Sequence, residues 1–485
     1  NHSLFLIFIW LYFLSSINSP PFHKINFNFS SILTFVRGIS PLVIFIFSIV
    51  YFFYNKIYER MKFSLLEILL LIYFFSQILS HIYFNHNIFS LDLYWPIAGI
   101  SLIIFFKSAF FQNNQNLKNF ILITLVLIFI FCTIITMQLI WEFYFDMYFS
   151  DQHFYHTSWY GGTTISENAQ LFGQEHPRTS GYGRLLIILF LYFFISYIYH
   201  YEDKFFKNKN KIKNIFFLIL LCSLSFCIWH VQNRAVLLFF FCFLGFLLLP
   251  IDYLIYKKKI KIIFVVFFIP FCLHLYDPVF RIQLIQKIIE KRDLNVKNLE
   301  DKYLKPSINK SHKLKSDNVF FDLDNIFFDK DGPIVQSNRW IKDIVKEDSN
   351  IKNYTSGRWD LWVKATSKIK INLIGYGPQA DRILLNQNVS NLLLYSFLCG
   401  GFLSFISIII LYFSVIYKLL LAVFKYNLFK MENNLFPKFS FFIISFFLVR
   451  SLFEVSFGIF SIDMIFFIMS LYLMESFLKN PKKIP

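Results

Sequence analysis

Long runs of apolar residues, separated by polar loops, make up most of the chain. A bilayer core is about 30 Å thick and takes roughly 20 apolar residues per helix. The run at residues 3–17 has the length of a signal peptide but lacks a basic start and a small-residue cleavage site, so we interpret it as the first span. The predicted spans are 3–17, 32–54, 63–84, 91–111, 117–143, 181–201, 214–229, 234–256, 260–276, 391–417, 439–455 and 457–478. This pattern predicts an all-α polytopic membrane protein with about twelve transmembrane helices.

The charges of the loops predict how these spans are oriented, because cytoplasmic loops are rich in Lys and Arg while outer loops are poor in them. The basic loops are 55–62, 112–119, 202–213, 257–261 and 418–438. They alternate with loops that are nearly free of lysine, at 85–90, 145–180 and 230–233. Both termini are therefore expected on the cytoplasmic side, and the polar segments 144–180 and 277–390 on the opposite side.

Three parts of the chain follow from this topology. Residues 1–276 are predicted to hold spans one to nine with a short outer loop at 144–180, and residues 391–485 to hold spans ten to twelve. Residues 277–390 are predicted to form a large, mostly helical outer loop that lies on the membrane as a cap. Its segment 358–371 has the spacing of an amphipathic helix, with lysines near its end that suit the negative end of the helix dipole.

The composition supports a membrane protein and narrows its chemistry. The chain is 56% hydrophobic, 21% aromatic and 16% charged, with a mean hydropathy of +0.53, and a soluble fold could not bury that much apolar surface. The lysines behind its net charge of +17 lie mostly in short loops, so nucleic-acid binding is the weaker interpretation. All six cysteines lie in apolar runs, so we expect neither a disulfide framework nor a cysteine metal site.

Arginine, unlike lysine, is kept at the outer ends of the predicted spans. Arg178 and Arg184 flank the start of the sixth span, Arg234 begins the eighth, and Arg358 and Arg382 precede the tenth. The guanidinium group offers a planar fork of donors that matches phosphate oxygens and stays charged in a partly dry site. Several such groups at one membrane surface suit a diphosphate. The alternative is that each arginine extends to lipid headgroups.

Two further charges lie inside the eleventh predicted span. Arg450 and Glu454 are four residues apart and therefore share one helix face. Charges within the membrane are costly, which makes them candidates for a functional role. The alternative is a structural pair in which each side chain neutralises the other.

Histidines and aromatic residues near the outer ends of the spans are weaker candidates. His230 precedes Arg234 and is a candidate proton acceptor, although a histidine at a helix end is more often an interfacial side chain. Trp362 and Tyr395 could stack on sugar faces or simply pack. The histidines of the 145–180 loop have no carboxylate or cysteine that completes a ligand set, so no metal is expected. Without a phosphate loop, a dinucleotide-binding glycine motif or a nucleophile elbow, no other cofactor is expected.

At these positions the sequence resembles the O-antigen ligase and O-antigen polymerase superfamily of bacterial envelope proteins. Its members have about a dozen spans, a large periplasmic loop late in the chain, an Arg-x-x-x-Trp helix and a Gly-x-Gly turn in that loop, and a His-Asn-type dipeptide before a glycine-rich span. The matching residues are Arg358 with Trp362, Gly375 with Gly377, and Asn391 with Gly400 and Gly401. Segment 178–184 is similar to an Arg-x-x-Gly segment of the polymerase branch, and segment 232–235 to the Ser-Arg sequence that begins a span in the family.

Ser390 departs from the family pattern. Ligases of this superfamily usually have a histidine at that position, implicated in activating the acceptor hydroxyl. Because serine is a poor base, the polymerase branch, in which this position varies, is favoured over the ligase branch.

The resemblance implies a glycosyltransferase that uses glycans carried on undecaprenyl diphosphate at the periplasmic face of the bacterial inner membrane. Arginines would bind the diphosphate and stabilise the charge that develops as the glycosidic bond breaks, an electrostatic route that needs no metal. The acceptor would be a second lipid-linked unit for a polymerase, and lipid A core or another acceptor for a ligase. Membrane lipid, chain-length regulators and flippases are the other partners that the resemblance implies.

These considerations assign a role to each candidate residue. We expect Arg234, Arg358 and His230 to act in catalysis. The residues expected to contact the substrate are Arg178, Arg184, Trp362, Arg382, Asn391, Tyr395, Arg450 and Glu454. An alternative of another class is a transporter or flippase of lipid-linked glycans. Its path would need polar residues deep in several spans, and the sequence shows them clearly only in the eleventh.

Overall fold

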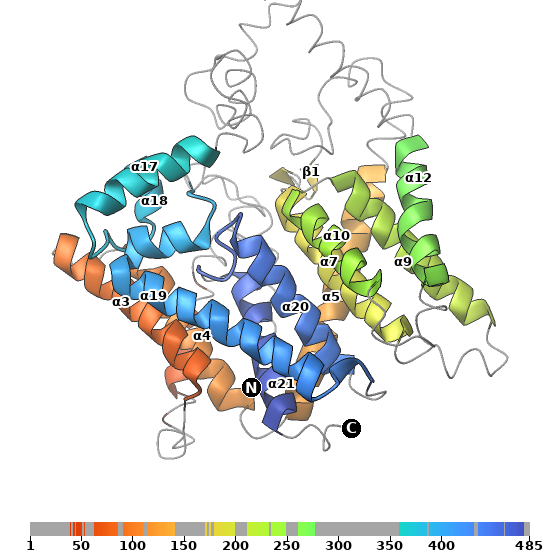
Figure 1. Ribbon diagram of the computed structural model, residues 1–485, viewed down its shortest axis with the longest axis horizontal. Helices are drawn as coiled ribbons and strands as arrows, with labels where there is room; N and C mark the ends of the chain where they lie inside the picture. Colours follow the sequence, from red (N-terminus) through yellow and green to blue (C-terminus); the bar gives the residue numbers. More distant parts are fainter. Residues whose placement is uncertain are drawn as a thin grey trace, which may run out of the picture.

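A computed structural model shows the described part of the chain as a bundle of helices (Figure 1). It describes residues 63–85, 91–110, 114–140, 170–171, 174–175, 179–198, 211–231, 234–248, 260–276, 358–385, 388–430, 435–459 and 461–479, with scattered positions between 39 and 53. The α-helices are α3 (Leu65–Asn85), α4 (Tyr94–Phe110), α5 (Asn114–Ile140), α7 (Thr179–Ser196), α9 (Lys211–Val231), α10 (Arg234–Leu248), α12 (Ile269–Tyr276), α17 (Arg358–Ile371), α18 (Ala380–Leu385), α19 (Leu392–Leu420), α20 (Leu435–Ser451) and α21 (Ile462–Lys479).

Short elements complete the described chain. They are the 3-10 helices η2 (Leu91–Leu93) and η8 (Leu428–Lys430), the π-helices η5 (Phe264–Phe268) and η7 (Leu421–Lys425), and a small antiparallel pair, β1 (Gln170–Leu171) and β2 (Gln174–Glu175). The helical fold class is therefore confirmed for the described residues.

A helix lies at each predicted span from 63–84 onward, and α17 has the bounds predicted for the amphipathic helix. Within the described ranges, three helices are long and apolar enough to cross a membrane, Leu65–Phe84, Leu117–Ile134 and Leu392–Lys425. Shorter apolar helices lie at Tyr94–Lys107, Tyr182–Ser196, Asn214–Trp229, Ala235–Leu247 and Ile260–Tyr276. The predicted span 3–17 lies outside the described residues, and 32–54 is described only at scattered positions. The number of twelve spans stays a prediction.

The helices form two groups with a pair between them (Figure 1). In one group α3 packs along α19 and beside α4, and α17 and α18 cover the end of α19. In the other, α7, α9, α10 and α12 pack together. Helices α20 and α21 lie between the groups, and α20 contacts both α7 and α10.

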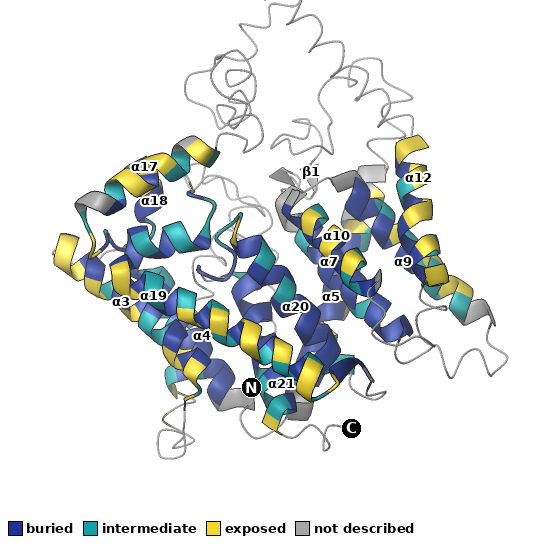
Figure 2. Ribbon diagram, viewed as in Figure 1, coloured by how far each residue is buried: buried dark blue, intermediate teal, exposed yellow. Residues whose placement is uncertain are grey.

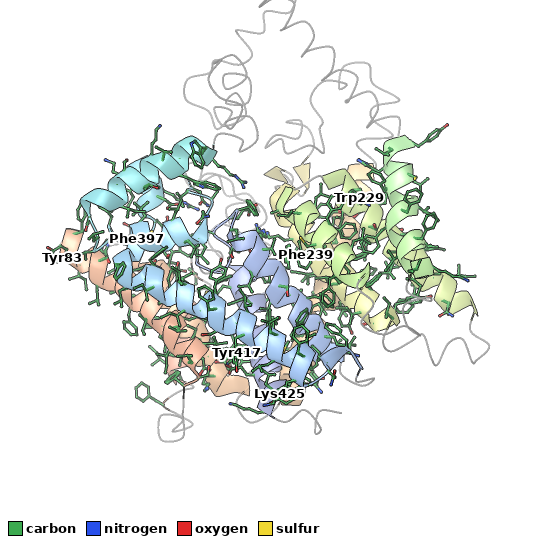
Figure 3. The ribbon with its side chains drawn as sticks, in the orientation of Figure 1. Tyr83, Trp229, Phe239, Phe397, Tyr417 and Lys425 are labelled. Carbon is green, nitrogen blue, oxygen red and sulfur yellow. The ribbon has the colours of Figure 1, made fainter. Side chains whose placement is uncertain are left out.

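Aromatic rings fill the interior of the second group and its contact with α20. Phe240 lies 5.1 Å from Phe190 and 4.5 Å from Phe267 between ring centroids, and Phe243 lies 4.8 Å from Phe442. Figure 3 shows the densely packed side chains around Phe239 on α10. Each buried aromatic pair adds about 0.5–1.5 kcal/mol beyond its buried area. This core explains why phenylalanine is so abundant in the chain.

The outer face of α19 is apolar and exposed. Phe402, Leu403, Ile410 and Phe413 are all exposed there, Phe424 is exposed on η7 directly after it, and Figure 2 shows the stripe in yellow along the helix. A stripe of this kind is unfavourable in water but suits the hydrocarbon of a bilayer. The surface therefore agrees with a membrane protein.

Helix α19 is broken near its start, where it meets α3. Gly401 has φ 66° and ψ −160°, a conformation that is essentially restricted to glycine. A Cβ atom on Gly400 would lie 2.7 Å from the Ser76 hydroxyl of α3, so the two helices approach closely at this point. The break leaves backbone groups of α19 without their usual partners within the helix.

A segment of the cap occupies this break. The Phe402 N–H donates to Leu373 O, Tyr376 N–H to Leu398 O, and Gly377 N–H to Cys399 O, each at 2.9 Å. Gly375 and Gly377, with φ values of 94° and 92°, allow residues 373–377 to fold back onto the helix. The turn at Gly375 and Gly377 and the glycine pair Gly400 and Gly401 of α19 thus form one contact, which we call the glycine joint.

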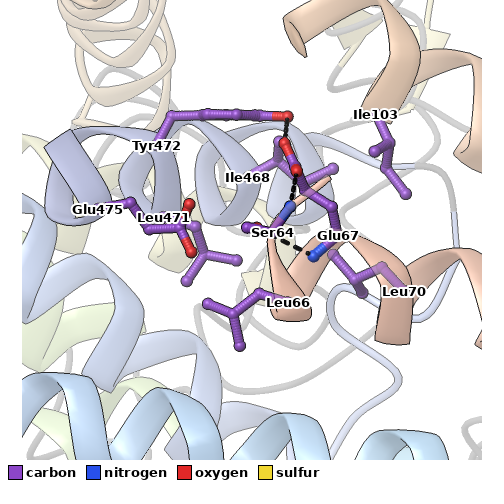
Figure 4. A pocket seen from close by; sticks show the side chains of 9 residues that line it. All are labelled: Ser64, Leu66, Glu67, Leu70, Ile103, Ile468, Leu471, Tyr472 and Glu475. Atoms are coloured by element: carbon purple, nitrogen blue, oxygen red, sulfur yellow. Dashed lines mark hydrogen bonds between the residues drawn. The ribbon is translucent and has the colours of Figure 1, made fainter. Parts of the chain in front are cut away.

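Buried ion pairs hold the opposite end of the bundle. Lys107 donates to both carboxylate oxygens of Glu67, at 2.9 and 2.8 Å, and the Tyr472 hydroxyl also bonds to Glu67. Lys418 pairs with Glu475 nearby. Figure 4 shows a small hollow at this end, lined by Glu67, Tyr472 and Glu475 among apolar side chains. Because Glu67 and Glu475 each pair with a lysine, ion pairs between described residues hold this end of the bundle together.

Replacing Gly401 tests the joint between the cap and α19. A Cβ atom at Gly401 would lie 2.2 Å from Ile374 O, whereas one at Gly245 of α10 would meet nothing within 4 Å. We expect Gly401→Ala to destabilise the fold by at least about 1–3 kcal/mol, because the backbone conformation disfavours alanine even without the clash. Gly245→Ala should leave stability unchanged or raise it slightly.

Thermal unfolding of the two variants in detergent makes the comparison. Equal melting temperatures for Gly401→Ala and Gly245→Ala would contradict the claim that the contact between the cap and α19 requires a glycine at position 401.

Candidate functional site

Arg450, at the end of α20, is the centre of a buried ion cluster. Its guanidinium group pairs with Asp463 in the first turn of α21 and with Glu454, and it donates to the Ser456 hydroxyl at 3.0 Å. Arg184 of α7 binds the other oxygen of Asp463 at 2.8 Å. The side chains of Arg450 and Asp463 are 2% exposed, and those of Arg184 and Glu454 are 22% and 23% exposed.

The charges of this cluster balance. In the ion pairs between described residues, Arg184 and Arg450 supply two positive charges, and Asp463 and Glu454 supply two negative charges. A buried charge without a partner costs several kcal/mol, so each member depends on the others. The predicted pairing of Arg450 with Glu454 is present, but Glu454 follows the end of α20 at Ser451 and is not inside the helix.

The predicted span 439–455 is therefore too long at its end. The helix α20 ends at Ser451, and the carbonyl groups of the next two residues accept hydrogen bonds from side chains of other elements. Arg358 of α17 donates to Phe453 O at 2.9 Å, and the Asn391 amide donates to Leu452 O at 2.9 Å. The loop 452–459 is thus fixed from two sides, by the ion cluster and by the cap.

Asn391 has a second bond that sets the start of α19. Its side-chain oxygen accepts from the Leu394 N–H at 3.0 Å, as an N-cap residue does. The Asn391 side chain therefore caps the start of α19 and also binds the loop that follows α20.

A buried carboxylate organises the rest of the cap. Asp381 of α18 accepts from the Val389 N–H at 3.1 Å and the Arg382 N–H at 2.9 Å, and Trp362 donates its indole N–H to Val389 O at 2.9 Å. Burial raises the pKa of the Asp381 carboxyl, and these backbone donors offset part of the rise. Asp381 therefore acts as an acceptor that holds residues 388–391 in place.

Several predicted contact residues lie apart from the ion cluster. Tyr395 is 1% exposed and its hydroxyl accepts from the Gln379 N–H at 3.4 Å, so it packs under the cap. Trp362 is partly buried and bonds to Val389 O, whereas Trp359 is 45% exposed. Arg382 is exposed on α18.

Three predicted residues fall wholly or partly outside the description. Arg178 lies outside the described residues, directly before α7. His230 and Arg234 are placed by their backbone only, at the end of α9 and the start of α10. Figure 1 shows this junction at the same end of the molecule as α17 and the start of α7.

Sequence reasoning missed Asp463. Asp463 lies near the start of the predicted span 457–478. A charged side chain in an apolar span is costly, so Asp463, like Arg450, is a candidate for a functional role. It also missed Gln77 and His81, which are buried in α3, so polar residues deep in the bundle are not confined to the eleventh predicted span. Among the described residues, no group of three or more His, Cys, Asp or Glu side chains could hold a metal ion.

The chain matches no protein-family model, no curated protein and no solved structure.

Asp463→Asn tests whether the ion cluster depends on this carboxylate. The change leaves Arg184 and Arg450 with one carboxylate between them, and removing one partner of a buried pair costs about 3–5 kcal/mol. We expect a large fall in melting temperature in detergent. Lys479→Gln is the matched control, because Lys479 is exposed at the other end of α21 and should have almost no effect. Similar melting temperatures for the two variants would contradict the assignment.

Proposed function

We propose that the protein is a membrane-embedded glycosyltransferase that joins undecaprenyl-diphosphate-linked oligosaccharide units, as a surface polysaccharide polymerase. It would act at the periplasmic face of a bacterial inner membrane, with both termini in the cytoplasm. One observation carries the proposal. Arg358, Arg184 and Arg450 come from distant parts of the sequence and converge on the residues between α20 and α21.

The arginines of the proposed site have different roles, which follow from how far each is buried and whether carboxylates neutralise it. Arg450 is buried and matched by carboxylates, so it supports the site without touching the ligand. Arg184 and Arg358 are only partly buried, so in the proposal they are the arginines that a phosphate meets. In the proposal Arg358 contacts the diphosphate directly, Arg234 completes the clamp, and Arg178 and Arg382 add positive charge at the rim.

Electrostatics would supply the rate enhancement. The diphosphate gains negative charge as the bond to the anomeric carbon breaks, and guanidinium donors already in place stabilise that charge without reorganising. The exposed ring of Trp359, 6.5 Å from Trp362 between ring centroids, offers a surface for a sugar on the same helix as Arg358.

The polymerase is favoured over the ligase because of Ser390. Its hydroxyl donates to Asn388 O at 3.3 Å, and its backbone has φ 51°. A serine in this position cannot take the proton that the family histidine is implicated in accepting. A ligase would transfer the glycan to lipid A core or another acceptor, and loss of it would leave that acceptor bare.

A transporter of lipid-linked glycans is a second candidate, favoured by the break in α19 and by the buried Gln77 and His81 of α3. Broken helices and buried polar groups mark many transport sites. Here, however, the backbone of residues 373–377 fills the break through three hydrogen bonds. This occupancy supports the enzyme, whose site lies at the end of the bundle.

Substituting Arg358 tests the proposed function. Losing one donor to a developing anion costs about 10²- to 10³-fold in rate, so Arg358→Ala should leave mostly single repeat units on the acceptor. Arg358→Lys should recover only part of the activity because lysine lacks the planar fork. Lys364→Ala, an exposed change on the same helix, is the control.

Glycan chain lengths in a deletion strain complemented by each variant provide the measurement, with membrane levels of the protein confirmed by blotting. Unchanged chain lengths for Arg358→Ala would refute the proposed function.

A further inference from the structure

The proposed transfer needs a group that accepts the proton of the attacking hydroxyl, and we infer that this group is Glu454. The inference rests on the proposed function and names a catalytic residue for it. Neither Ser390 nor the guanidinium groups can accept a proton at neutral pH. A carboxylate at the same place can.

Glu454 lies beside the two points where the cap holds the loop. Its neighbour Phe453 accepts from Arg358, and Leu452 accepts from Asn391, which follows Ser390 in the chain. The Glu454 N–H donates to Arg450 O at 2.9 Å, and Glu454 O accepts from the Ser456 N–H at 3.0 Å. Its backbone is therefore fixed next to the residues that align with the family motif.

Exposure singles out Glu454 among the described carboxylates at this end. Asp463 is buried and uses both oxygens on Arg184 and Arg450, and Asp381 is buried and uses both oxygens on backbone N–H groups. The Glu454 side chain is 23% exposed and binds Arg450 through Oε2. In the part of the chain that the structure describes, Oε1 is left to accept a further hydrogen bond.

The reaction balances with Glu454 in this role. The hydroxyl oxygen of the acceptor sugar attacks the anomeric carbon of the donor and forms the new C–O bond. The bond from that carbon to the diphosphate oxygen breaks, and its electron pair leaves with the lipid diphosphate. The hydroxyl proton passes to the Glu454 carboxylate, which later releases it to water.

Proton uptake would also change the charge of the cluster. Before transfer, the positive charges of Arg184 and Arg450 are matched by Asp463 and Glu454. Protonation of Glu454 makes the charge of the cluster more positive by one at the moment when the leaving diphosphate gains negative charge. The same step that removes the proton therefore helps to hold the leaving group.

The competing interpretation is that Glu454 only neutralises Arg450. The two interpretations differ in what a substitution does. A purely structural partner would affect stability and donor binding, and a small acid added to the solution would not replace it. A proton acceptor can be replaced by an added acid if space for it exists.

The experiment uses Glu454→Ala, Glu454→Gln and Glu454→Asp in the full chain, assayed in membranes that carry the endogenous lipid-linked units. Glu454→Ala and Glu454→Gln should lose about 10²- to 10⁴-fold in polymerisation rate. Sodium formate should restore part of the rate of Glu454→Ala but not that of Glu454→Gln, whose side chain fills the space. Glu454→Asp should keep measurable activity, because it retains a carboxylate.

Binding of undecaprenyl diphosphate, followed by its effect on the melting temperature of the purified variants, should match the wild type in all three. Wild-type rates in Glu454→Gln would overturn the inference, as would loss of binding without rescue by formate. Were Glu454→Ala to unfold, Glu454→Asp and Glu454→Gln would decide together: a folded Glu454→Asp that is measurably more active than a folded Glu454→Gln supports a carboxylate, and equal rates in the two reject it.

Failure of the inference can be told from failure of the proposed function. If Glu454→Gln is fully active while Arg358→Ala is inactive, the enzyme stands and its proton acceptor is another group. If Arg358→Ala is also fully active, the proposed function itself fails.

Discussion

The ion pair between Arg450 and Asp463 is the interaction on which the rest of the structure depends. It places a guanidinium group in a position where only a carboxylate can stabilise it, and it joins the end of α20 to the start of α21. Through Arg184 the same carboxylate reaches α7, and so it ties the aromatic core to the central helix pair. The loop between α20 and α21 has its shape because its first residues are held at this point.

A second constraint brings the cap to that loop. The break at Gly401 lets residues 373–377 bind into α19, and this fixes α17 over the bundle. Arg358 and Asn391 then reach the carbonyl groups of Phe453 and Leu452. The glycine joint and the ion cluster together bring Arg358 of the cap to the loop that carries Glu454, where transfer of a lipid-linked sugar is a consistent proposal.

The sequence predicted the helices well because their apolar runs are long, and it predicted α17 because its spacing is amphipathic. It did not predict the loop after Ser451, since the hydropathy of residues 439–478 is nearly continuous and the turn is made by donors from Arg358 and Asn391. It grouped Arg178, Arg184, Arg234, Arg358 and Arg382 by charge and position. In the structure Arg184 shares Asp463 with Arg450, Arg358 binds the loop that follows α20, and Arg382 is exposed on α18. It missed Asp463, whose importance depends on partners from two other helices, and it could not show that Tyr395 packs inside.

The most direct measurement is photocrosslinking with an undecaprenyl diphosphate analogue that carries a reactive group beside the phosphates, followed by peptide mapping. The account predicts labelling of residues 358–371 and of the loop 452–459, and competition by unlabelled undecaprenyl diphosphate. Labelling that is confined to the exposed apolar face of α19, or that undecaprenyl diphosphate does not reduce, would contradict it.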